Sequence, residues 1–353
     1  MPKRILSYIY GNIHLIAVWA VLFVLLVLLF QGAAETKRVF PAFSLRYDDG
    51  IEGKAALAAR QYSINGVEDE EFWPTFWRED DMVKAESETA GATCISISYS
   101  GEGSLAWNAE FLRGAMPGVA DEAGCALSGE LAQSLFGSMD VVGMTVYLDE
   151  NEYIVRGVFE GSQAVALLSK GDEKTDLRWQ AADLSGGPKD TSKTTASNFG
   201  VSSGLGRPSA VLDGSVFSAW SMLACFAPII ILVVYALIRL LLQIRRPFRG
   251  VAVFAACLGI ALFLPAILAL LPGSLVPDMW SDFSFWSSLG KQFDNSLREF
   301  FGMIPHLRDV EGKLLLLRQG VLCSAGVLCA AILCIIQNRK PFVRDQNSEV
   351  RYN

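Results

Sequence analysis

Four long apolar segments constrain what this chain of 353 residues can fold into. They are Ile13–Phe30, Val216–Leu242, Val251–Leu271 and Gln319–Ile336. An α-helix rises about 1.5 Å per residue, so segments of roughly 18–27 residues span or nearly span a hydrocarbon core about 30 Å thick. Hydrophobic residues make up 52% of the chain and concentrate in these segments. We therefore predict an integral membrane protein with four transmembrane helices.

The charges predict the orientation of the chain in the membrane. Residues 32–215 hold 29 Asp and Glu against 15 Lys and Arg, a net charge of −14, so the rest of the chain carries +7. The short segments next to the apolar ones are basic, through Lys3, Arg4, Arg239, Arg245, Arg246, Arg249, Arg339, Lys340, Arg344 and Arg351. Short loops rich in Lys and Arg stay on the cytoplasmic side of a membrane. We expect a multi-pass protein of the cell (plasma) membrane, with both termini cytoplasmic and residues 32–215 extracytoplasmic. An acidic domain beside basic membrane edges argues against nucleic acid.

Residues 108–161 are the most informative part of the predicted outside domain. Ser128 is a suitable N-cap for a helix over Gly129–Phe136, because its hydroxyl can accept a free backbone N–H, and Gly137 fits a left-handed C-cap. The runs Thr145–Leu148 and Tyr153–Phe159 are β-prone and are joined by a polar turn, which predicts a hairpin. The expected domain is therefore α+β.

This order of turn, strand, LSGELAQSLFG, glycine and hairpin resembles the extracytoplasmic core domain of MacB/FtsX-like permeases of ABC transporters. The positions that carry the resemblance are Leu127, Ser128, Glu130, Leu131, Ala132, Leu135, Phe136, Gly137, Gly143, Val155, Gly157, Val158 and Phe159. One span, an outside domain and three further spans is also the layout of that family. The resemblance implies a subunit that performs no chemistry. A separate ATPase and a second permease copy or homologue would be its partners, beside the lipid bilayer.

The remaining outside segments are less distinctive. We expect a helix over Gly53–Tyr62, a strand over Thr93–Tyr99 and a mobile loop over 171–208, which is rich in Gly, Ser, Thr, Lys and Asp. Residues 184–188 read LSGGP, which resembles an ABC ATPase signature, but the sequence has no phosphate-binding G-x-x-x-x-G-K-[ST] motif. We interpret that likeness as coincidence. Apolar residues at helical spacing between Phe285 and Ile304 predict an amphipathic helix, lying either in the outer interface or against the outside domain.

Candidate functional residues are few. The basic loop with Arg245, Arg246 and Arg249 is a candidate ATPase-docking segment, although ordinary positive-inside anchoring explains it equally well, and it lacks the acidic residue of the family's coupling segment. Cys94 and Cys125 could form a disulfide or remain two buried thiols. The sequence has two distant histidines and no nucleophile motif or Cys/His cluster, so we expect no catalytic residues, no metal and no cofactor.

These observations predict an α-helical membrane protein with four transmembrane helices and an α+β extracytoplasmic domain between helices 1 and 2. The expected parts are 1–31 (anchor helix), 32–215 (outside domain), 216–243 (helix 2), 251–272 (helix 3), 273–312 (outer loop), 313–337 (helix 4) and 338–353 (cytoplasmic tail). The leading functional hypothesis is a non-catalytic ABC permease subunit that couples a separate ATPase mechanically to the outside domain. The alternative is a membrane-anchored binding, sensing or scaffold protein without ATP coupling.

Overall fold

The computed structural model describes residues 13–40, 43–66, 72–171, 176–187, 192–243, 250–251, 253–254, 258–259 and 283–339. The chain divides into two compact units. The membrane unit consists of Met1–Glu35, Ala219–Asp278 and Leu315–Asn353, and the domain unit consists of Thr36–Ser218 and Met279–Leu314. Three helices, α2 (Ile13–Val39), α7 (Gly214–Gln243) and α10 (Leu307–Arg339), each begin in one unit and end in the other.

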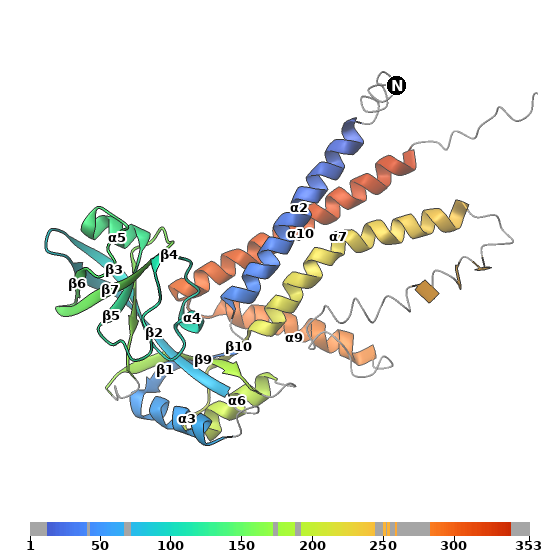
Figure 1. Ribbon diagram of the computed structural model, residues 1–353. Helices are drawn as coiled ribbons and strands as arrows, with labels where there is room; N and C mark the ends of the chain where they lie inside the picture. The colour runs from blue at the N-terminus through green and yellow to red at the C-terminus, as the bar shows by residue number, and fades with distance from the viewer. Residues whose placement is uncertain are drawn as a thin grey trace, which may run out of the picture. The chain divides into compact units, whose positions relative to one another are not determined.

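The three helices are drawn as blue, yellow and red ribbons in Figure 1, and in the membrane unit small residues make room for contacts between them. Gly32 leaves room for the Gln319 amide, whose nitrogen would lie 2.3 Å from a Cβ at position 32 and donates to the Leu29 carbonyl oxygen at 3.1 Å. Gly326 likewise packs on Pro228. All three helices contain stretches long and apolar enough to cross a membrane. The predicted span over 251–272 lies almost entirely outside the described residues, so the count of four stays a prediction.

The domain unit is built on a ten-stranded sheet with the order β10-β1-β9-β2-β3-β8-β5-β7-β4, and β6 pairs with β2 and β7. The strands are β1 (Phe43–Glu52), β2 (Phe72–Glu86), β3 (Gly91–Ser100), β4 (Phe111–Gly114), β5 (Gly124–Ser128), β6 (Thr145–Leu148), β7 (Asn151–Phe159), β8 (Val165–Ser169), β9 (Arg178–Gly186) and β10 (Ala210–Asp213). Because β6 joins β2 to β7, the strands β2, β3, β8, β5, β7 and β6 close into a ring.

The closed ring has its own hydrophobic core, which includes Leu127, Val146, Val155 and Leu168 from the strands. Helix α5 (Gly129–Phe136) contributes to this core. The strand β2 belongs both to the ring and to the open part of the sheet, and its pairing register shifts between Asp80 and Val83. Met82 within this bulge has a φ of 61°, so the strand changes direction where the two parts of the sheet meet.

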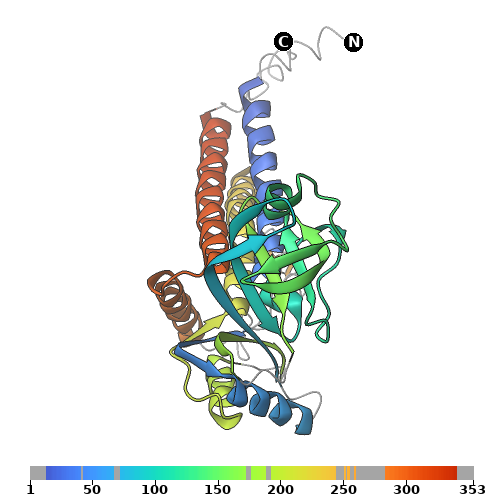
Figure 2. The same cartoon turned by 90° about the vertical axis from the view of Figure 1, so that its left-hand side faces the viewer.

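The open part of the sheet carries helices on one face. Helices α3 (Gly53–Asn65) and α6 (Lys193–Ser202) lie together there, as Figures 1 and 2 show. The core between them and the sheet contains Phe43, Leu45, Phe72, Phe76, Leu184 and Phe199. Since strand side chains alternate between faces, the residues between these apolar ones point to the opposite face.

The expected elements of residues 108–161 are present, with small shifts at their ends. The Ser128 hydroxyl accepts the Leu131 N–H at 3.3 Å, and Gly137 ends α5 with a φ of 68°, which confirms both caps. The hairpin is confirmed, although β7 begins at Asn151. Its turn residues Asp149 and Glu150 both have positive φ, as tight two-residue hairpin turns require.

The expectation of a mobile loop over 171–208 is wrong for its described parts. Strand β9 lies between β1 and β2, with Trp179, Ala181, Ala182, Asp183 and Leu184 buried. Helix α6 follows, capped by Ser192. The sequence did not indicate these two elements because their residues are small or polar. In β9, Ala181, Ala182 and Asp183 give no alternation of apolar and polar residues. The LSGG likeness falls at the end of β9, where Leu184 is a core residue.

Two further boundaries differ from the sequence prediction. Helix α2 continues past residue 31 to Val39, and α10 begins at Leu307, inside the predicted outer loop. The amphipathic helix is present as α9 (Phe283–Gly302). Its last turns pack on the domain unit, because Phe300 contacts the Phe40 and Phe217 rings and Glu299 pairs with Lys193 at 2.8 Å. Of the two positions expected for this helix, the described side chains of α9 therefore favour packing against the outside domain over lying in the outer interface.

The two N-cap serines should differ in their contribution to stability. The Ser128 hydroxyl also accepts the Val165 N–H of β8 at 3.0 Å and is fully buried, whereas Ser192 caps α6 at the surface. Ser128→Ala leaves two buried donors without an acceptor and should cost about 2–3 kcal/mol, against about 1 kcal/mol or less for Ser192→Ala. Thermal unfolding of the full chain in detergent measures both. Equal shifts in midpoint would contradict the double role of Ser128.

Candidate functional site

The face of the open sheet opposite α3 and α6 is unusually polar. Strand alternation places Ser44 and Arg46 of β1, Asp183 of β9 and Thr75 of β2 on this face, and all four are buried. The register confirms that they are neighbours, since Ser44 lies opposite Asp183 and Asp183 lies opposite Thr75. A cation and an anion buried on a sheet need partners from another element, because an unpaired buried charge is costly.

The first turn of α10 supplies these partners. Asp309 accepts a hydrogen bond from Arg46 Nη2 at 2.8 Å, and Arg308 forms an ion pair with Asp183. All four side chains are at most 10% exposed. Arg308 also donates to the Ala106 carbonyl oxygen at 3.2 Å. Two crossed ion pairs therefore fix the start of α10 to β1 and β9. We call these four residues, together with Trp77, the α10 anchor.

Trp77 of β2 stands at the centre of the α10 anchor. Its indole N–H donates to the Asp183 carboxylate at 3.0 Å. The guanidinium carbons of Arg46 and Arg308 lie 4.5 Å and 5.4 Å from the centre of its ring, within the range of cation–π attraction. The ring is 1% exposed, so it removes both guanidinium groups from water while offering them a favourable face. Leu307 packs against the buried apolar cluster that contains Trp77.

The α10 start is also capped by carboxylates. Glu79 of β2 accepts the Leu307 N–H with both oxygens, at 2.8 Å and 3.1 Å. The Asp309 carboxylate reaches back to the N–H of His306 at 3.3 Å, in the manner of a capping box. The charge of Asp309 at this helix N-terminus also interacts favourably with the helix dipole. Strand β2 thus contacts α10 through both Trp77 and Glu79.

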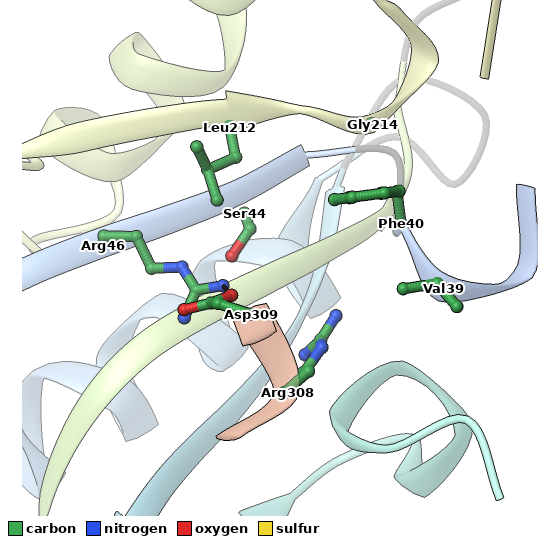
Figure 3. Close-up of a pocket in the computed structure, with 8 residues that line it drawn as sticks. All are labelled: Val39, Phe40, Ser44, Arg46, Leu212, Gly214, Arg308 and Asp309. Carbon is green, nitrogen blue, oxygen red and sulfur yellow. Dashed lines mark hydrogen bonds and ion pairs between the residues drawn. The ribbon is translucent and has the colours of Figure 1, made fainter. Parts of the chain in front are cut away.

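The α10 anchor borders a small pocket, shown in Figure 3. Its lining comes from the end of α2 (Val39, Phe40), β1 (Ser44, Arg46), the β10–α7 junction (Leu212, Gly214) and α10 (Arg308, Asp309). Several buried polar atoms here lack a hydrogen-bond partner among the described residues: Arg46 Nε and Nη1, Ser44 Oγ and Asp183 Oδ1. Beside the pocket, the rings of Phe40, Phe217 and Phe300 pack together. The domain-side ends of all three long apolar helices therefore meet at one place.

Burial dominates the electrostatics of this site. It lowers the pKa of Arg46, and the carboxylates of Asp309 and Asp183 counteract that effect. Burial raises the pKa of Glu79 to about 7, with smaller contributions from Asp81 and Asp309, while the Leu307 N–H and Arg46 oppose the shift. Burial also lowers the pKa of His306, as does the charge of Arg46. Among the described residues, no cluster of His, Cys, Asp and Glu could hold a metal ion.

The sequence did not identify this site. Residues carrying the family resemblance lie at the end of β5, on α5, on β7 and in the α5–β6 connection, and most are structural: Ser128, Leu131, Leu135, Phe136, Gly137, Gly143, Gly157 and Phe159. Arg245, Arg246 and Arg249 fall outside the described residues, so their docking role stays a prediction. The α10 anchor combines residues from three places far apart in the sequence, on β1, β9 and α10, with Trp77 of β2. The one available signal was the charged pair Arg308-Asp309 directly before an apolar helix.

Cys94 and Cys125 are free thiols in the structure. Both are buried in the core of the closed ring, on β3 and β5. Burial raises the pKa of Cys94 to about 11 and that of Cys125 to about 12. In this structure both are buried thiols, which are unreactive because the thiolate is the reactive form, and the disulfide stays a prediction.

Comparison with known proteins gives structural neighbours at low identity. No protein-family model matches the sequence, and no curated protein is significantly similar to it. The extracellular domain of the ABC-type transporter YknZ from Gram-positive bacteria aligns with 48% of this chain and 97% of its own, at 11% identity and a TM-score of 0.36. The periplasmic region of MacB from Actinobacillus actinomycetemcomitans aligns with 49% of this chain and 87% of its own, at 10% identity and a TM-score of 0.39.

Removing one charge of the α10 anchor should destabilise the protein strongly. Asp309→Asn keeps the shape of the side chain but leaves Arg46 buried without its counter-ion, which should cost about 3–5 kcal/mol. The matched control is Asp294→Asn, which breaks an exposed i,i+4 pair with Arg298 on α9 and should cost about 0.5 kcal/mol or less. Thermal unfolding of the full chain in detergent compares them. Similar midpoints for the two variants would mean that the anchor contributes little.

Alkylation should distinguish free thiols from a disulfide. With a maleimide at pH 7 and no reductant, Cys94 and Cys125 should stay unmodified in the folded chain, because both are buried and protonated. After unfolding in denaturant, still without reductant, both should be modified, as read by peptide mass spectrometry. If both react only after a reductant is added, the chain isolated from its membrane carries the disulfide instead.

Proposed function

We propose that this chain is a non-catalytic permease subunit of an ABC-type complex of the MacB/FtsX-like kind, which passes movement of its membrane helices to an extracytoplasmic domain. One observation carries the proposal. Helix α10 is continuous from Leu307 to Arg339, contains an apolar stretch long enough to cross a membrane, and begins in the α10 anchor. A displacement along or around this helix acts directly on the sheet.

The anchor suits transmission because it distributes force over several strands. The first turn of α10 is bound to β1 through Arg46, to β9 through Asp183, and to β2 through Trp77 and Glu79. Strand β2 continues from the open sheet into the closed ring. A tilt of α10 that preserves these bonds must therefore move both parts of the domain. Both ion pairs form in one relative position of helix and strands, so a displacement that breaks them leaves buried charges unpaired.

The family assignment rests on the sequence motif and the predicted layout. The segment over 127–159 carries the order of residues that resembles the core domain of these permeases, and its helix and hairpin are present. The residues that would contact an ATPase belong to the basic loop at 245–249. A separate ATPase and a second permease copy or homologue complete the proposed complex, with the domain outside the membrane and both termini in the cytoplasm.

The competing hypothesis is a membrane-anchored binding, sensing or scaffold protein without ATP coupling. The same anchor would then hold the domain at a fixed place relative to its helices instead of moving it. The two hypotheses differ in what the basic loop does. An ATPase-coupled subunit needs Arg245 and Arg246 for contact with a partner, whereas a scaffold needs positive charge there only to set its topology.

Affinity isolation of the tagged chain from its native membrane tests the proposal. In mild detergent, a stoichiometric ABC ATPase should copurify and hydrolyse ATP. The double variant Arg245→Ala/Arg246→Ala should reduce its recovery at least tenfold. The matched control Arg344→Ala/Arg351→Ala removes the same number of positive charges from the cytoplasmic tail and should leave recovery unchanged.

The other outcomes are equally specific. If no ATPase copurifies, but an extracytoplasmic partner does and survives neutralisation of the basic loop, the scaffold hypothesis replaces this one. An equal loss of ATPase from both double variants would show that total inner charge, and not a docking site at 245–249, governs recovery.

A further inference from the structure

Glu79 and His306 form a pair that the α10 anchor does not use for its ion pairs. The Glu79 side chain is 9% exposed and that of His306 is 27% exposed, with His306 Nδ1 4.0 Å from Glu79 Oε1. The Glu79 backbone N–H donates to Gln180 Oε1 at 2.8 Å, and its carbonyl oxygen accepts from Gln180 Nε2 at 3.1 Å. The His306 ring stands edge-on to Trp77, 5.4 Å away. These contacts hold the pair beside Leu307, the first residue of α10.

Among the residues that the structure describes, the surrounding charges leave Glu79 without a counter-ion of its own. The charged groups that act on Glu79 or on His306 are Arg46 from β1, Asp81 from β2 and Asp309 from α10. Arg46 is already paired with Asp309, and Arg308 with Asp183. The Arg78–Asp80 ion pair, also on β2, is likewise balanced. An ionised Glu79 beside a neutral His306 would thus be an uncompensated buried charge, close to two other carboxylates.

Protons can reach this pair from solvent. His306 lines a cavity of about 530 Å³ between β1, β9, β10 and the α9–α10 connection. Much of the polar lining of this cavity is already bonded within the protein. Gln180 binds the Glu79 backbone, and Ser209 binds the Arg46 carbonyl and the Asp48 N–H. The cavity therefore gives water access to His306 rather than presenting a set of free groups to a ligand.

We propose that α10 docks on the sheet with a proton on Glu79 and none on His306, so that docking depends on pH. In the docked state the pair is uncharged, and the neutral carboxyl still accepts the Leu307 N–H. In an undocked state both groups are hydrated, Glu79 is ionised and His306 titrates normally. The only covalent bonds that change are those to the exchangeable protons: an O–H bond forms on Glu79, and a bond to hydrogen breaks on His306 or on solvent. The inference concerns α10 docking alone and holds with or without an ATPase.

The signs of the two linkages follow from the pKa shifts. The raised pKa of Glu79 favours docking fully below about pH 4.5, and this contribution is lost as pH rises towards about 7. The lowered pKa of His306 acts the other way, since its contribution is present above about pH 6.5 and is lost as pH falls through the docked value. Between these limits docking moves a proton from His306 to Glu79 with little net exchange. From about pH 6.5 to about pH 7 docking takes up a proton, and above this range Glu79 is ionised in both states, so net uptake ends.

Hydrogen exchange at the start of α10 tests the proposal on the full chain in detergent. The peptide over 303–312 reports opening of the Leu307 N–H. Wild type is compared with Glu79→Gln at each pH, so that the intrinsic pH dependence of exchange cancels. Gln keeps the carbonyl acceptor but cannot ionise. The opening equilibrium constant of wild type, divided by that of the variant, should rise at least tenfold between pH 5 and pH 7.5 and then level off. One titrating group can change this ratio by at most about tenfold per pH unit.

Two further variants complete the test. Glu86→Gln removes an exposed carboxylate on the same strand and should follow wild type at every pH. His306→Gln should differ from wild type in its pH dependence only below about pH 6.5, which provides a readout even if Glu79→Gln does not fold. A wild-type to Glu79→Gln ratio that stays constant across this range, or a His306→Gln profile parallel to wild type, would overturn the proposal.

Discussion

The burial of two arginines and two aspartates around Trp77 is the constraint on which the rest of this domain depends. One charge lies on β1, one on β9 and two on the first turn of α10, so each ion pair forms only when these elements are assembled together. Desolvating these groups is expensive, and their mutual attraction compensates only with good geometry. The arrangement therefore favours one relative position of helix and sheet more than it adds to stability, which is the property a mechanical joint needs.

The two faces of the open sheet differ in the kind of side chain that they bury. The face towards α3 and α6 is an ordinary apolar core of Phe, Leu and Ala side chains. The opposite face carries the charges that bind α10. Long strand β2 links this face to the closed ring, and its bulge at Met82 lies three residues beyond Glu79. An element that contacts the helix, the open sheet and the ring is well placed to make them move together.

The elements with strong local signals were predictable from the sequence. The apolar lengths of α2, α7 and α10, the Ser128 and Gly137 caps of α5 and the β6–β7 hairpin all follow from composition, capping chemistry or alternation over a few residues. Strand β9 and helix α6 were missed because their residues are small or polar, and β9 shows no apolar alternation because both faces of the sheet are covered there, one by α3 and α6 and the other by the start of α10. Helix α9 was predicted as a helix, but its packing partner could not be chosen from its own periodicity.

The sequence by itself determined that this chain enters a membrane, that an acidic α+β domain lies between the first two long apolar helices, and where the motif of that domain lies. These conclusions depend on neighbouring residues, whose hydrophobicity, charge and capping act locally. The tertiary structure alone decided that Arg46, Asp183, Arg308 and Asp309 meet around Trp77, and that Glu79 caps α10 beside His306. Such pairings join residues separated by 125 to 263 positions, and each charge looks like an ordinary solvated side chain until the fold removes it from water.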